Sequence, residues 1–320
     1  MRAYFIRITE KDNPNKVLAL YTSFKPNGTT NGAALQVEWD IPGYVYGTPA
    51  GGATVKVYGV NFDDIRQASD WNDADVTIYG GMAKGLPLAN PQQAGILFQG
   101  SIFQCFGNAV GTEVSLNLIA YPKGGTNDAP VNLAYLWAKG TTMEAAARQI
   151  LAIAYPKSAI TGGWSDALVY TEDQPMVYKT LPQFAQWADE TSHAIIPDST
   201  YKGAQIRPTP AGFDLFDGTK LPAAKPIAFV DLIGQPTWLD PGTMQFSTVM
   251  RADLSVGDVI TLPQGSNIVN TPNSFTRGRQ KTAFTGRYQI KNIRHVGNYR
   301  QNTAQAWVTI IDCYDLPAGS

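Results

Sequence analysis

The chain has 320 residues, of which 44% are hydrophobic and only 16% are charged, and its formal net charge is −1. At about 100 to 200 residues per domain, this length predicts about two or three domains. Soluble domains usually carry about 25% charged residues, so the low value favours a protein that buries much of its surface against partners. The near-zero net charge excludes a global attraction to nucleic acid, membranes or acidic substrates.

The first residues and the two cysteines predict a protein that is not exported. The first ten residues, MRAYFIRITE, alternate as a strand does and lack the continuous apolar core of a signal peptide. No stretch approaches 18 consecutive apolar residues, so we expect no spanning helix and no membrane binding. Cys105 and Cys313 stand far apart and are expected to be reduced, structural thiols. We therefore expect a protein that is made and kept in the cytoplasm until it is assembled into something larger.

The first 121 residues predict β structure, because apolar and polar residues alternate between clusters of Gly, Pro, Asn and Asp. The expected strands span 3–9, 16–22, 34–41, 53–60, 74–81, 95–106 and 112–121. Between the fourth and the fifth strand, Asn61 is a predicted cap for one helical turn. Seven successive strands indicate a barrel or a sandwich.

The middle of the chain changes to a helical period after a linker at 122–130. Thr141 and Glu144 form a predicted capping box for a helix that runs to about Ala154, and Thr180 with Gln183 forms another. Strands are expected afterwards at 193–197, 204–209 and 212–217. The middle is thus predicted to be a small two-helix α+β domain.

The last part returns to β structure. Strands are expected at 226–232, 243–250, 258–263, 286–297 and 306–315, with a long mobile loop at 263–283. LFQGSIFQ (97–104) and AFTGRYQI (283–290) share Phe-x-Gly before an alternating strand, which predicts two copies of one barrel. Gly100 and Gly286 would then be equivalent bulge or close-approach glycines. The expected fold class is mainly β, with β domains at 1–125 and 225–320 flanking the α+β domain at 126–224.

The sequence contains none of the common nucleotide, zinc or hydrolase motifs. His193 is expected to stabilise the end of its helix, and His295 is expected to be structural, since no nucleophile motif accompanies a pairing with Asp312 or Asp315. The spacing within an acidic set fits no oxygen-ligand loop, so a solvated face is expected there. This set comprises Asp63, Asp64, Asp70, Asp73 and Asp75. We predict no enzyme, no catalytic residues, no cofactor and no metal.

A run of basic residues near the C-terminal end stands out in the sequence. No acidic residue lies between Asp258 and Asp312, whereas seven basic residues do: Arg277, Arg279, Lys281, Arg287, Lys291, Arg294 and Arg300. One interpretation is a surface that meets an acidic protein neighbour, such as the acidic set of another subunit. A second is single-stranded nucleic acid, because aromatic residues that could stack on bases are interleaved with the basic ones. A third is a plain solvent-exposed surface.

The C-terminal sequence also resembles a known family. GQPTWLDPGTMQFSTVMRADLSVGDVITL, FTGRYQIKNIRHVGNYR and AWVTIIDCYD resemble the closing domain of baseplate hub proteins from Mu-like and related tailed phages. The family's signature falls on Gly257, Asp258, Gly286, Tyr288, Ile290, Ile293, His295, Gly297, Trp307 and Thr309. Asn298 departs from it, since an acidic residue is usual there, and NYRQNTAQ is an insertion. The first β region and the two-helix middle also fit the family's plan.

This resemblance implies a fold and a role. Both β domains would be tail-tube-like barrels, and three copies would form a ring that adapts a sixfold tail tube to a threefold central spike. The implied partners are a homotrimer, a tail tube or distal tail protein, a central spike and a tape measure protein, with DNA only as passing cargo. The implied location is the baseplate of the virion tail, and the seven basic residues would face a partner or the channel.

Two other functions stay open at this point. A β-rich carbohydrate-binding or glycan-cleaving protein is suggested by the 7 Trp and 15 Tyr residues. A glycosidase would need two carboxylates about 5 to 10 Å apart in one cleft, and no pattern places such a pair. A single-strand binder would instead show an affinity that depends steeply on salt.

Overall fold

The computed structural model describes residues 1–47, 52–83, 90–123, 131–240, 242–263, 284 and 286–316. The chain divides into two units. Unit 1 comprises 1–43, 51–121 and 223–320, and unit 2 comprises 44–50 and 122–222. The expected loop at 263–283 and most of the linker at 122–130 lie outside the described residues. No helix in the described ranges is long and apolar enough to cross a membrane.

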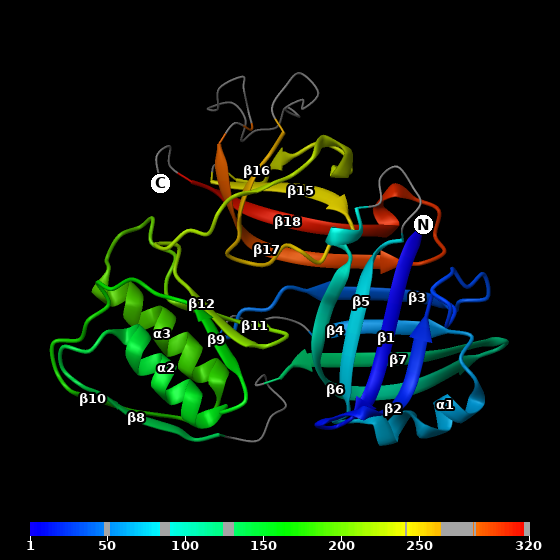
Figure 1. Cartoon of the computed structure of the whole chain (residues 1–320), viewed down its shortest axis with the longest axis horizontal. Coiled ribbons are helices and arrows are strands. Elements are labelled where there is room, and N and C mark those ends of the chain that lie inside the picture. Colours follow the sequence, from blue (N-terminus) through cyan, green and yellow to red (C-terminus); the bar gives the residue numbers. More distant parts are fainter. Residues whose placement is uncertain are drawn as a thin grey trace. The chain divides into compact units, whose positions relative to one another are not determined.

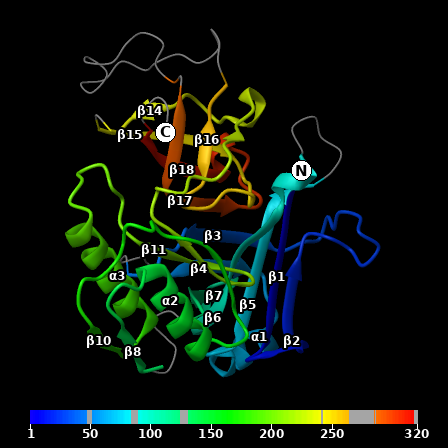
Figure 2. The same ribbon diagram turned by 60° about the vertical axis from the view of Figure 1, so that its left-hand side comes forward.

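Unit 1 is mainly β, as the alternating pattern predicts (Figure 1). Its first region holds β1 (Arg2–Glu10), β2 (Asn13–Thr22), β3 (Gln36–Pro42), β4 (Ala53–Tyr58), β5 (Asp75–Met82), β6 (Gly95–Val110) and β7 (Glu113–Pro122). Its second region holds β13 (Lys225–Pro226), β14 (Thr237–Trp238), β15 (Thr243–Val249), β16 (Val259–Thr261), β17 (Arg287–Asn298) and β18 (Trp307–Asp315). Figures 1 and 2 show β1, β2 and β5 crossing β3, β4 and β7 steeply, as orthogonally packed sheets do.

The two β regions belong to one sheet. Its strand order is β14-β15-β18-β17-β3-β4-β7-β6-β5-β1-β2, with β13 and β16 off this path. The joint is the antiparallel pair of β17 and β3, in which His295 lies opposite Ile41 and Asn298 opposite Glu38. This ladder joins strands more than 250 residues apart in sequence, which local patterns do not reveal.

Short helices and turns close the ends of unit 1. In α1 (Phe62–Gln67) the Asn61 side chain accepts a hydrogen bond from Asp64 N at 2.6 Å, which confirms the predicted cap. The prediction of a continuous strand at 226–232 is wrong. The chain pairs at β13, turns through a 3-10 helix at Phe229–Asp231, and then forms only a single β-bridge between Leu232 and Thr248. The physical reason is the Asp231 carboxylate, which turns inward to a buried arginine.

Unit 2 packs two helices on short strands (Figures 1 and 2). It holds β8 (Leu133–Trp137), α2 (Met143–Ala154), β9 (Ala159–Gly162), β10 (Gln174–Tyr178), α3 (Leu181–Ile195), β11 (Gln205–Thr209) and β12 (Gly212–Phe216). β10 pairs with β8, and β11-β12-β9 form a second sheet. The inner faces of α2 and α3 meet in one core, which confirms the predicted helical periodicity. The sequence did not predict β8, β9 or β10.

Two local predictions in unit 2 are wrong. The cap of α2 is Thr142, whose hydroxyl accepts from Ala145 N, while Glu144 binds Arg148 and the backbone of Trp164. The capping box at Thr141 therefore does not form, because this carboxylate has stronger tertiary partners. The segment 193–197, expected to be a strand, contains the end of α3. The helix stops at Ile195 because Pro197 sterically disfavours the helical conformation of Ile196.

Candidate partner-binding surface

In β17, the residues that match the signature of the resembled family and the basic residues lie on opposite faces. Tyr288 and Ile290 point inward, and a bulge between Ile290 and Asn292 shifts the phase of the strand. After the bulge Ile293, His295 and Gly297 are the buried positions. The bulge thus lets one strand bury apolar residues at both ends while its basic residues stay at the surface.

His295 is a structural residue, as predicted. Its side chain is 4% exposed, and its Nδ1 lies 3.0 Å from Thr309 Oγ1. Burial lowers the pKa of His295 to about 4, so the ring is neutral at pH 7. Asp312 does not pair with it, since that carboxylate accepts from Gln245 at 2.8 Å.

The basic residues that the structure describes contact their own chain. The guanidinium of Arg294 binds both oxygens of Asp40, and this carboxylate raises the pKa of Arg294 above its usual value. Lys291 lies 5.0 Å from the centre of the Tyr314 ring, and Arg300 donates to Ala34 O. Arg287 begins β17 and is half-buried. Arg277, Arg279 and Lys281 lie outside the described residues.

The acidic set likewise has partners within the chain. Asp64 accepts a hydrogen bond from the Tyr21 hydroxyl at 2.7 Å, and Asp75 accepts from Asp12 N at 3.0 Å. Asp63 forms an exposed ion pair with Arg66. The described parts of the chain contain no group of three or more His, Cys, Asp or Glu residues that could hold a metal ion.

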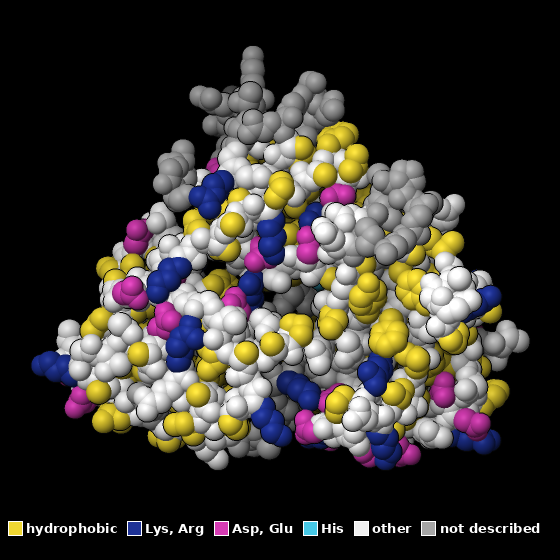
Figure 3. Space-filling view, in the orientation of Figure 1, with side chains coloured by type: hydrophobic (Ala, Val, Ile, Leu, Met, Phe, Trp, Pro, Cys, Tyr) yellow, Lys and Arg dark blue, Asp and Glu magenta, His cyan; other side chains and the backbone are white. Residues whose placement is uncertain are grey.

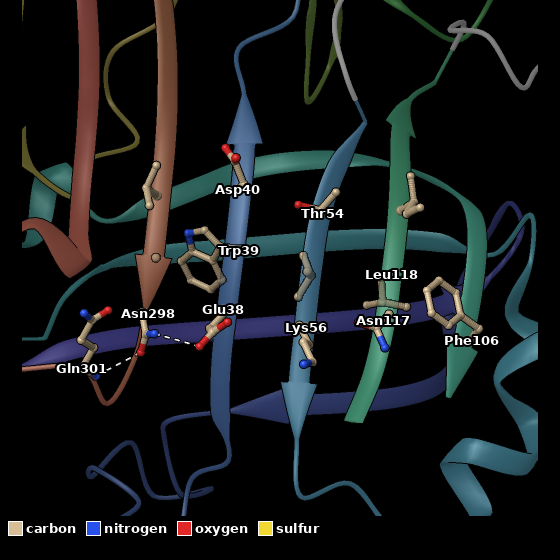
Figure 4. A pocket seen from close by; sticks show the side chains of 14 residues that line it. Glu38, Trp39, Asp40, Thr54, Lys56, Phe106, Asn117, Leu118, Asn298 and Gln301 are labelled. Atoms are coloured by element: carbon tan, nitrogen blue, oxygen red, sulfur yellow. Dashed lines mark hydrogen bonds between the residues drawn. The ribbon is translucent and has the colours of Figure 1, made fainter. Parts of the chain in front are cut away.

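A groove of about 520 Å³ lies on the outer face of β17, β3, β4 and β7 (Figure 4). Strand register aligns its floor in two transverse rows. The first row is Asn298, Glu38, Lys56 and Asn117, and the second is Val296, Asp40, Thr54 and Ile119. Phe106 of β6 stands beyond Asn117 at one end (Figure 4).

Hydrogen bonds fix the first row of the groove. Asn298 Nδ2 donates to Glu38 Oε1 at 2.9 Å, and the Tyr58 hydroxyl donates to Glu38 Oε2 at 2.9 Å. Asn298 Oδ1 accepts from Gln36 Nε2 at 2.7 Å. The groove was not predicted from the sequence. The one signal for it was Asn298, which replaces the acidic residue that is usual in the resembled family.

The inner side of the same strands is tightly packed. The Trp39 ring lies 4.5 Å from that of Trp307, and a Cβ on Gly297 would come within 2.4 Å of Trp39 Nε1. Gly100 is a close-approach glycine as predicted, since a Cβ there would meet Tyr121 O at 2.1 Å. Gly286 has a φ of +140° and no such neighbour within 4 Å.

A buried polar cluster ties the loops of unit 1 together. The Arg251 side chain, 4% exposed, lies 3.3 Å from Asp231 and binds Asp253 at 2.7 and 2.8 Å. Gln93, which precedes β6, donates to Asp231 at 2.7 Å. Thr309 connects the cluster to His295, because its hydroxyl accepts from Arg251 N at 3.0 Å. The cluster therefore joins both β regions.

A partly exposed row of apolar and aromatic side chains crosses another part of the sheet of unit 1. Phe5 of β1 lies opposite Tyr79 of β5, which lies opposite Ile96 of β6. Ile96 is 41% exposed, and Figure 3 shows hydrophobic side chains gathered over β5 and β1. Such a surface agrees with the low share of charge, since exposed apolar patches are typical of protein interfaces.

The sheet joined through β17 and β3, with the two-helix unit inserted in it, makes up a fold found in phage tail proteins. It is similar over 99% of both chains to a 43 kDa tail protein of prophage MuSo2 from Shewanella oneidensis, with a TM-score of 0.54 and 5% identity. A tail protein from Neisseria meningitidis covers 98% of this chain and 96% of its own, with a TM-score of 0.51 and 8% identity.

A secretion protein has a similar fold. The Escherichia coli c3393 protein is described as a type VI secretion component similar in structure to the T4 tail proteins gp27 and gp5. The similarity covers 88% of this chain and 73% of that protein, with a TM-score of 0.51 and 9% identity. No family model matches the sequence, and no curated protein sequence matches it. The predicted mainly β, hub-like fold is confirmed by these structures.

Proposed function

We propose that this chain is the structural baseplate hub of a phage or phage-like tail. Three copies form a ring that adapts the sixfold tail tube to a threefold central spike and encloses part of the DNA channel. The observation that carries this proposal is the fold shared with a Mu-like prophage tail protein over the whole of both chains. The type VI secretion component described as similar to T4 tail proteins supports the same role.

The proposal assigns a part to each region of the chain. Residues 1–125 and 225–320 are the two tube-like barrels of each subunit, and 126–224 is the inserted α+β domain. Three copies present six barrel-like elements to the tube, and the threefold ring seats the spike. A distal tail protein and a tape measure protein are further partners, and DNA passes through as cargo. The location is the virion tail, after assembly in the host cytoplasm.

The chemistry of the described surface supports a non-enzymatic role. His295 is buried and bonded to Thr309, and Arg294 of β17 is held by Asp40. The row of half-buried Phe5 and Tyr79 and exposed Ile96 suits burial against another subunit. The basic residues of β17 are proposed to face a partner or the channel.

The test is the native mass of the purified chain over a concentration series, with images of the particles. Three copies of the 34.7 kDa chain give about 104 kDa, and we expect a closed ring with threefold symmetry and a central channel. A monomer or a dimer at every concentration would contradict the trimeric hub.

A further inference from the structure

The groove on the outer face of β17, β3, β4 and β7 is large enough to hold a small molecule. Its volume of about 520 Å³ lies within the range of about 300 to 1,000 Å³ that is usual for small-molecule sites. The four-residue row from Asn298 to Asn117 crosses three strand spacings, about 14 Å at about 4.8 Å per spacing. This length suits a ligand of two sugar rings.

The groove has no excess of positive charge, and Lys56 Nζ also lies 3.6 Å from the Glu113 carboxylate. Glu38 lies directly opposite Lys56 in the first row, and Asp40 of the second row is paired with Arg294. Polyanions bind through an excess of positive charge, which this floor lacks. The groove therefore favours a neutral ligand over a nucleic acid.

Backbone groups contribute little to recognition in the groove. β3 is paired with β17 on one side and with β4 on the other, and β4 is paired with β3 and β7. A peptide that binds by adding a strand needs a free edge, and the floor offers none. Recognition is left to side chains.

Those side chains match the hydroxyl-rich rim and the apolar face of a pyranose. Carboxylate, ammonium, hydroxyl and amide groups stand side by side in the rows and offer both donors and acceptors. Asn117 Nδ2 is buried and has no hydrogen-bond partner among the described residues, and a turn of this side chain into the groove would pair the donor with a ligand oxygen. Phe106, 42% exposed at the end of the first row, offers a ring for stacking.

We propose that this groove binds a short neutral saccharide. Glu38 and Asp40 accept hydrogen bonds from its hydroxyls, Lys56 and Asn117 donate to its oxygens, and Phe106 packs on the apolar face of one ring. Glu38 is held in place by Asn298 and Tyr58, so the site is preorganised. This property goes beyond the hub function and does not depend on it.

The test is saturation-transfer NMR of the full chain with cellobiose, maltose, lactose and di-N-acetylchitobiose, each at about 10 mM, a concentration suited to weak sites. We expect at least one disaccharide to bind. Asn117→Leu and Lys56→Met should each weaken that binding about tenfold. Asn108→Leu, which alters an exposed residue of β6 outside the groove, is the matched control and should leave it unchanged.

Three outcomes would overturn the proposal. One is the absence of binding by all four disaccharides, and another is binding that neither groove substitution weakens. The third is that a dT oligonucleotide or an extended peptide competes for the groove while the disaccharides do not. Thermal unfolding of each variant checks that it is folded. Because the two groove substitutions alter different residues, a folding defect in one variant still leaves the other to test the proposal.

Discussion

At the residue scale, His295 connects a sequence motif to the stability of the fold. The ring is buried, it contacts Thr309, and burial lowers its pKa from 6.5 to about 4. The unfolded chain therefore binds a proton between about pH 6.5 and pH 4 that the folded chain does not. Folding stability that depends on this histidine is fully present above pH 6.5 and is lost as the pH falls toward 4.

We predict that this histidine makes unit 1 sensitive to acid. The size of the shift corresponds to about 3 kcal/mol between pH 7 and pH 4. Urea unfolding of the native chain and of His295→Gln at pH 7 and pH 4.5 measures the effect. The native chain should lose more unfolding free energy than the variant, because only it carries the histidine. Equal losses would show that other groups account for the acid response.

The sequence indicated the structural role of His295, since it alternates with apolar neighbours, but not its partner. Thr309 lies opposite it only because β17 pairs with β18 in one register. The same limit applies to the groove. The polar positions of its strands are visible in the sequence. The alignment of Asn298, Glu38, Lys56 and Asn117 instead depends on three strand pairings, one of which joins β3 to β17 near the other end of the sequence.

At the element scale, long periodic strands and helices were predictable and short or irregular elements were not. β3, β7, β15 and β18 follow the alternation that predicted them, and α2 and α3 follow their apolar faces. β8, β9 and β10 have only four or five residues each, too few for a clear period. The missed 3-10 turn before β14 depends on the buried Asp231 carboxylate, a tertiary contact.

That contact leads to a prediction for the loops of unit 1. Arg251→Met should destabilise the fold by about 3 to 5 kcal/mol, because it leaves the buried Asp231 without its cation. The matched control is Arg294→Met, which removes an exposed pair with Asp40 and should cost less than about 1 kcal/mol. Denaturant unfolding of the native chain and of both variants measures these two losses of unfolding free energy. Similar small costs would mean that water replaces Arg251 in the cluster.

At the scale of the whole molecule, each unit has a core of its own. The core of unit 2 includes Trp137, Trp164 and Phe184, and also Tyr46 from the segment between β3 and β4. Tyr46 N donates to Ile206 O, and its ring lies 6.0 Å from that of Phe213 in an edge-on contact. A residue between two strands of unit 1 thus completes the core of unit 2.

We predict that the two cores unfold in separate transitions that two tyrosine substitutions distinguish. Tyr46→Ala removes a buried ring from unit 2 and Tyr4→Ala removes one from unit 1, where its hydroxyl donates to Leu35 O. Each should cost about 3 to 5 kcal/mol, the usual effect of deleting a large buried aromatic side chain. In calorimetry Tyr46→Ala should lower one transition and Tyr4→Ala the other, because each core is contained in its own unit. A single transition that both substitutions lower equally would contradict this independence and would mean that the two units fold as one cooperative body.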